Sequence, residues 1–105
     1  MDNDHIAEIF QSLGPVTIRR MFGGKGVYCD GRILAVVFKG DLLLKADEET
    51  APLFAEAGAV QWAYESKSGK QAHMPYWSIP DAALDEPDLM AVWVRRAYEA
   101  ALRAK

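Results

Sequence analysis

The sequence predicts an α+β domain with two layers, in which helices cover one side of a mostly antiparallel five-stranded sheet. Apolar residues recur at helical spacing near both ends of the chain, and short β-branched runs separated by tight turns lie between them. The chain has 105 residues, of which 50% are hydrophobic, and this suffices for one core without disulfides or metals. We therefore expect the order α-β-β-β-α-β-β-α in a single domain, residues 1–105.

The first expected element is a short amphipathic helix. Its apolar face is formed by Ile6, Ile9, Phe10 and Leu13. Asn3 or Asp4 is expected to cap its start, because their side-chain oxygens accept from free backbone N–H groups. The Gly-Pro pair at positions 14 and 15 ends the helix.

Five strands are expected in two groups. Residues 27–29, 32–38 and 42–45 form a meander, because Asp30 and Gly31 suit a type I′ hairpin turn and residues 39–41 turn the chain again. Residues 60–65 and 71–78 form a second hairpin. Pro75 has no N–H to donate, so the last strand should lie at a sheet edge or carry a bulge.

Two further helices complete the expected order. One lies between residues 47 and 58, with Thr50 as its N-cap and Gly58 at its end. The other follows a cap at Asp85 and runs from residue 89 to residue 104. Its core face is formed by Leu89, Trp93, Ala97 and Ala100.

Charge and cysteine content narrow the class of protein. The chain carries 12 Lys and Arg against 15 Asp and Glu, a net charge of −3, which argues against direct binding to nucleic acid. Cys29 is the one cysteine, so no internal disulfide forms and a reducing cytoplasm is expected. The N-terminus lacks the pattern of a signal peptide, and the longest apolar run, residues 33–38, is too short for a membrane span.

A cationic, glycine-rich tract before the meander is the candidate binding site. Arg19, Arg20 and Lys25 lie beside glycines, a combination that suits an acidic or phosphorylated group. The tract lacks the first glycine and the hydroxyl residue of a phosphate-binding loop. The candidate partner- or anion-binding residues are Arg19, Arg20, Met21, Phe22, Gly23, Gly24, Lys25 and Tyr28.

No catalytic site, metal site or cofactor is predicted. Cys29 and His73 have no neighbours in the sequence that would pair them, and one cysteine with two histidines does not give zinc-ligand spacing. The other aromatic residues are interpreted as core and rim residues, with an aromatic groove on the second hairpin as the alternative. These residues are Trp62, Tyr64, Tyr76, Trp77 and Trp93.

Residues 20–28, Arg-Met-Phe-Gly-Gly-Lys-Gly-Val-Tyr, resemble the N-terminal domain of the TfoX/Sxy family of competence regulators. The similarity continues in residues 41–47, Asp-Leu-Leu-Leu-Lys-Ala-Asp, and in the Met-Pro-Tyr triplet at 74–76. It spans residues 9–101 and also includes Phe54, Gly58, Tyr64, Lys70, Trp93 and Ala97. The resemblance implies a bacterial α+β domain, similar to type III secretion chaperones, without enzymatic activity.

The family resemblance also implies a role in gene regulation. Such regulators promote transcription of DNA-uptake genes together with a cyclic-AMP receptor protein, and they carry a second, helical domain, so we expect a stand-alone version here. The preferred hypothesis is a non-enzymatic module that acts through a protein partner such as a transcription factor, with Phe22 as an anchor. The alternatives are a small-anion or nucleotide sensor that uses the same tract, and direct DNA binding. A homodimer that forms through an edge strand or the last helix is a further alternative.

Overall fold

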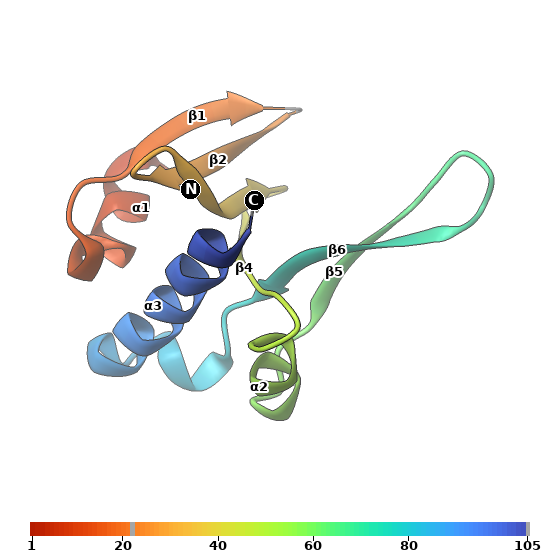
Figure 1. Ribbon diagram of the computed structural model, residues 1–105. Coiled ribbons are helices and arrows are strands. Elements are labelled where there is room, and N and C mark those ends of the chain that lie inside the picture. Colours follow the sequence, from red (N-terminus) through yellow and green to blue (C-terminus); the bar gives the residue numbers. More distant parts are fainter. Residues whose placement is uncertain (22, 105) are drawn as a thin grey trace.

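The computed structural model describes residues 1–21 and 23–104, and within them it contains one antiparallel sheet with helices packed on one face (Figure 1). The order of the six strands across the sheet is β1-β2-β3-β4-β6-β5. The predicted α+β class is confirmed, although the sheet has six strands and not five. The strands are β1 (Thr17–Met21), β2 (Gly24–Cys29), β3 (Arg32–Phe38), β4 (Asp41–Lys45), β5 (Gln61–Glu65) and β6 (Gln71–Ser78).

The additional strand is β1, and it changes the structure of the cationic tract. The sequence pattern predicts that residues 19–26 precede the first hairpin, but in the structure they belong to the hairpin of β1 and β2. Thr17 pairs with Tyr28 and Met21 pairs with Gly24, in register along the whole of β1. The strand was missed because only one face of an edge strand needs apolar residues, and its exposed arginines hide the alternation.

The meander follows the predicted turns. Asp30 and Gly31 both have positive φ, at 53° and 78°, as the type I′ turn requires. Lys39 and Gly40 repeat this conformation between β3 and β4, with φ of 52° and 82°. Two-residue turns of this kind match the twist of the strands and fix their register.

The second hairpin joins the sheet through β6, which lies between β4 and β5. The expectation that Pro75 marks an edge is therefore wrong, and the alternative of a bulge holds. The register between β5 and β6 shifts from Gln61–Trp77 to Ala63–His73, so Pro75 lies in an irregular segment. Its carbonyl still accepts a hydrogen bond of 2.9 Å from the N–H of Ala46. Away from this junction, the hairpin extends from the body of the protein (Figure 1).

The helices lie on the face that carries the main core. They are α1 (Asn3–Ile9), α2 (Ala51–Glu56) and α3 (Pro87–Arg103), with short 3-10 turns at Gln11–Leu13 and Asp81–Ala83. The cap of α1 is Asp2, which accepts from the N–H of His5 at 2.8 Å, and not Asn3 or Asp4. Within the part of the chain that the structure describes, no helix combines the length and apolar character that a bilayer crossing demands.

α3 supplies most of the helical contribution to the core. Its residue Trp93 lies 4.6 Å from the ring of Phe54 on α2, between ring centroids, and Phe54 in turn lies 6.2 Å from Trp77 on β6. Trp93, Ala97 and Ala100 are buried, as the helical spacing predicted. These contacts bring α2, α3 and β6 together.

Asp47 ties the end of α3 to the loop before α2. Its carboxylate accepts hydrogen bonds from Nε of Arg103 at 2.6 Å and from the backbone N–H groups of Glu49 and Thr50. Arg103 also forms an ion pair with Glu49. The hydrogen bond from Arg103 is the main cause that lowers the pKa of Asp47 from 3.8 to about 2. Thr50 stands at the N-cap position, but its hydroxyl accepts from the N–H of Asp47 and does not cap α2.

We expect the Asp47→Asn variant to lose less folding stability on acidification than the parent chain. The folded chain keeps Asp47 ionised to lower pH than the unfolded chain, so its stabilisation is present above pH 3.8 and is lost as the pH falls to about 2. Because the ion pair of Asp47 and Arg103 is partly exposed, the free energy of unfolding of the variant should be about 1 kcal/mol lower at neutral pH. Urea unfolding at pH 7, 4 and 2.5 measures this, and an equal loss at all three pH values would contradict it.

Candidate functional site

The hairpin of β1 and β2 does not bring the three predicted cations together. Arg20 is opposite Lys25 in the register, so both side chains are on one face of the sheet. Arg19 is opposite Gly26, and its side chain is on the other face, because side chains alternate along a strand. The expectation that Arg19, Arg20 and Lys25 share one surface is therefore wrong.

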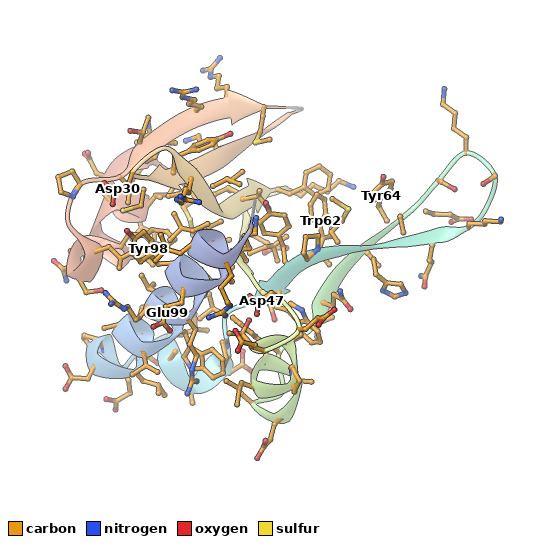
Figure 2. The ribbon with its side chains drawn as sticks, in the orientation of Figure 1. Asp30, Asp47, Trp62, Tyr64, Tyr98 and Glu99 are labelled. Atoms are coloured by element: carbon orange, nitrogen blue, oxygen red, sulfur yellow. The ribbon has the colours of Figure 1, made fainter. Side chains whose placement is uncertain are left out.

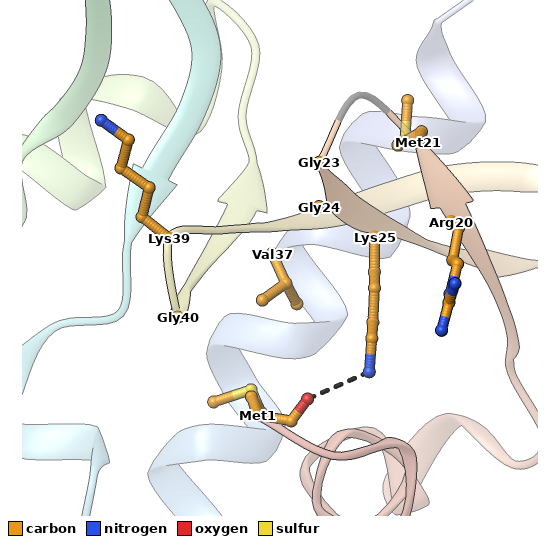
Figure 3. Close-up of a pocket in the computed structure, with 9 residues that line it drawn as sticks. All are labelled: Met1, Arg20, Met21, Gly23, Gly24, Lys25, Val37, Lys39 and Gly40. Carbon is orange, nitrogen blue, oxygen red and sulfur yellow. Dashed lines mark hydrogen bonds between the residues drawn. The ribbon is translucent and has the colours of Figure 1, made fainter.

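Arg20 and Lys25 line an open hollow of about 610 Å³ beside the N-terminus (Figure 3). Met21, Gly23, Gly24 and Lys39 also line it. The ammonium group of Lys25 donates hydrogen bonds to the carbonyl of Met1 at 3.1 Å and to Oδ1 of Asn3 at 2.7 Å. These hydrogen bonds hold the N-terminal segment against β2, so the ammonium group of Lys25 is already bound within the protein.

The glycines of the tract are needed for close packing. A Cβ atom at Gly24 would lie 2.1 Å from the carbonyl oxygen of Val37 on β3, which no side chain tolerates. At Gly26 a Cβ atom would lie 2.7 Å from Sδ of Met21. Both residues are in β2, which pairs with a strand on each side, so their backbone is committed to the sheet. Phe22, the predicted anchor, lies outside the described residues.

The other face of the sheet is apolar and aromatic, and the helices leave it open. Its centre is a small cluster in which Val36, Leu43 and Tyr76 are buried, and Ile33, Trp62 and Met74 pack around them. Every one of these residues belongs to a strand, whereas α1, α2 and α3 contribute to the larger cluster on the opposite side. We call this face, with its cluster and the side chains around it, the open face.

Aromatic rings form a continuous patch on the open face. Trp62 lies 5.2 Å from Phe38 and 6.3 Å from both Tyr64 and Tyr76, between ring centroids. Figure 2 shows Trp62 and Tyr64 on the side of the second hairpin that faces away from α2. The alternative of an aromatic groove on this hairpin is thus favoured for Trp62, Tyr64 and Tyr76. Trp77 and Trp93 instead lie in the core with Phe54.

Two cations rest on rings of this face. The guanidinium carbon of Arg19 lies 5.3 Å from the ring centre of Tyr28, and Nζ of Lys39 lies 5.4 Å from the ring centre of Phe38. Such contacts attract a cation to a ring while leaving its N–H groups free to bind an anion. Sequence analysis selected Arg19 and Tyr28 but missed Lys39, which it treated as a turn residue.

Among the side chains that could take part in catalysis, Cys29 and Tyr98 both contact Oδ2 of Asp30, whereas His73 belongs to the second hairpin. Cys29 is buried, and burial raises the pKa of its thiol, which opposes the thiolate form that a nucleophile needs. His73 is exposed on the protruding hairpin. The hydroxyl of Tyr98 donates to Asp30 at 2.9 Å, and this bond raises the pKa of Tyr98. Among the described residues, no cluster of His, Cys, Asp and Glu could hold a metal ion.

The fold and this site define a small α+β domain that presents one uncovered, aromatic sheet face. A family model described as the TfoX N-terminal domain matches residues 8–101, nearly the whole chain. The chain therefore belongs to the TfoX N-terminal domain family, a family of regulatory domains, and the resemblance found in the sequence is confirmed. A comparison with curated proteins found no match.

We expect Gly24→Ala to destabilise the sheet by about 2–3 kcal/mol, because the new methyl group meets the backbone of β3. Gly26→Ala is the matched control, since its Cβ first meets the movable end of Met21 and should cost less. Thermal unfolding followed by circular dichroism compares the two variants. Equal stability of Gly24→Ala and the parent chain would show that β2 and β3 do not approach this closely.

Proposed function

We propose that this protein is a non-enzymatic module of the bacterial cytoplasm that regulates transcription by binding a protein partner through the open face of its sheet. Membership of the TfoX N-terminal domain family supports a regulatory role. The observation that carries the proposal is the aromatic patch on the face that no described helix covers, where Tyr64 is exposed and Trp62 and Met74 are half-buried. Exposed apolar surface on a soluble protein marks an interaction site.

The composition of the patch also supports protein binding. Aromatic residues, methionine and arginine are the types enriched at the centres of protein interfaces. The open face carries Trp62, Tyr64, Met74 and Tyr76, and Arg19 lies on the same face over the ring of Tyr28. Tyr64 is 48% exposed, which is high for a large aromatic side chain. We therefore place the contact on the open face rather than on the whole cationic tract.

The alternatives from the sequence gain less support. A small anion would need backbone N–H groups that converge on it, but Gly24 and Gly26 lie in a strand paired on both sides. Direct binding to duplex DNA through the predicted tract would need Arg19, Arg20 and Lys25 on one face, but the sheet separates Arg19 from the other two. The arrangement of the glycines thus does not favour binding of a small anion, and that of the three cations does not favour binding of duplex DNA.

Photo-crosslinking in living cells tests the proposal. The photoreactive residue p-benzoylphenylalanine replaces Tyr64 on the open face, and in the control it replaces Val92, which is exposed to a similar degree on α3, at 42%. We expect one predominant protein adduct from position 64 and none of the same mass from position 92. Mass spectrometry of the adduct should identify a protein of the transcription apparatus.

Two results would contradict the proposed function. The first is the absence of any protein adduct from position 64 when the chain is expressed at its natural level. The second is an adduct with a protein that has no part in transcription.

A further inference from the structure

The open face contains a small apolar hollow. It has a volume of about 230 Å³, and its walls include Ile33, Val36, Phe38, Trp62, Met74 and Tyr76. Small-molecule sites usually measure ~300–1,000 Å³ and place several polar groups around the ligand. The hollow is smaller than that range, and of the described residues that line it Lys25 alone is charged. Its size and lining suit one large apolar side chain of a partner, the usual anchor of a protein interface.

Cationic side chains lie on the same face of the sheet as this hollow. Arg19 is held over Tyr28 on the β1–β2 side, and Lys39 is held over Phe38 at the β3–β4 turn. Lys45 is opposite Tyr76 in the register, so both side chains lie on the open face. Asp41 is opposite Phe38 and lies on the same face. This face therefore carries Arg19, Lys39 and Lys45 as well as Asp41, whereas the whole chain has a net charge of −3.

The rings of the face are poorly arranged for single-stranded nucleic acid. Binding platforms for bases present exposed ring faces along a cationic groove. Here Tyr76 is only 8% exposed, and its ring meets Trp62 edge-on at 61°. The rings pack against one another, so they form the walls of a pocket and not a row of stacking surfaces.

We propose that the open face binds an extended acidic segment of a protein partner, which inserts one large apolar side chain into the hollow. This inference rests on the proposed function and specifies its partner by chemistry. The carboxylates of the segment pair with Arg19 and Lys39, while the anchor is buried among Ile33, Trp62 and Met74. Exposed charge pairs of this kind weaken as salt screens them, whereas burial of the anchor does not.

A titration with a synthetic peptide tests this proposal. The probe is a short peptide with a single central Phe flanked by Glu residues, added to the full ¹⁵N-labelled chain. The three tryptophan indole N–H signals report on the site, because Trp62 lines the hollow while Trp77 and Trp93 lie in the core. We expect the Trp62 signal to shift selectively, with a dissociation constant on the order of 100 μM at low salt.

Matched variants locate the contact. Arg19→Glu should weaken binding of the probe roughly tenfold, because it replaces attraction by repulsion on the open face. Arg20→Glu changes the adjacent residue of the same strand on the opposite face and should leave binding unchanged. A probe with Ala in place of Phe should lose most of its affinity, and a probe with Lys in place of Glu should not bind.

Three outcomes would overturn the inference. These are no shift of Trp62 with the acidic probe, equal effects of Arg19→Glu and Arg20→Glu, and binding of an oligouridine strand at Trp62 in place of the peptide. If crosslinking at Tyr64 captures a transcription protein while the probe fails, the proposed function stands and only the acidic segment is wrong. If the probe binds and crosslinking fails, the recognition chemistry stands without the regulatory role.

Discussion

Each strand of this sheet divides its side chains between a face that helices cover and a face that they leave open. The period of two along a strand sets this division, except at the bulge in β3, where the adjacent residues Leu34 and Ala35 both reach the main core. Val27, Ala35 and Leu44 therefore reach the main core, while Val36, Leu43 and Tyr76 gather on the opposite side. The helices are too few to cover both faces, so the second cluster stays at the surface. The candidate interface is a direct consequence of this layer architecture.

The same constraint separates residues that are neighbours in the sequence. Arg19 and Arg20 are adjacent, yet they belong to opposite faces because β1 pairs with β2 in register. Lys25 then serves the helical side, where it binds the N-terminal segment through Met1 and Asn3. A cationic tract that is continuous in the sequence is thus divided between two faces, and Arg19 shares the face of the aromatic patch.

Aromatic packing and the ion pairs of Arg103 help to fix the helical layer to the sheet. Phe54 lies between Trp77 and Trp93 and so joins α2, α3 and β6. Asp47 and Arg103 connect the loop after β4 to the last turn of α3. The hydroxyl of Tyr98 on α3 donates a hydrogen bond to Asp30 in the turn between β2 and β3, so this polar pair also links the helix to the sheet.

The sequence by itself determined the fold class, the three helices, the turns at Asp30-Gly31 and Lys39-Gly40, and the resemblance to the TfoX N-terminal domain. These follow from local periodicity, from turn chemistry and from residue identity, which do not depend on distant contacts. Only the tertiary structure decided that residues 17–21 are a strand, that β6 pairs with β4, and that Pro75 lies inside the sheet. Register and strand order arise from pairing between distant segments. That pairing also assigned Trp62 and Tyr76 to the open face and Trp77 to the core, a choice that composition and spacing left undecided.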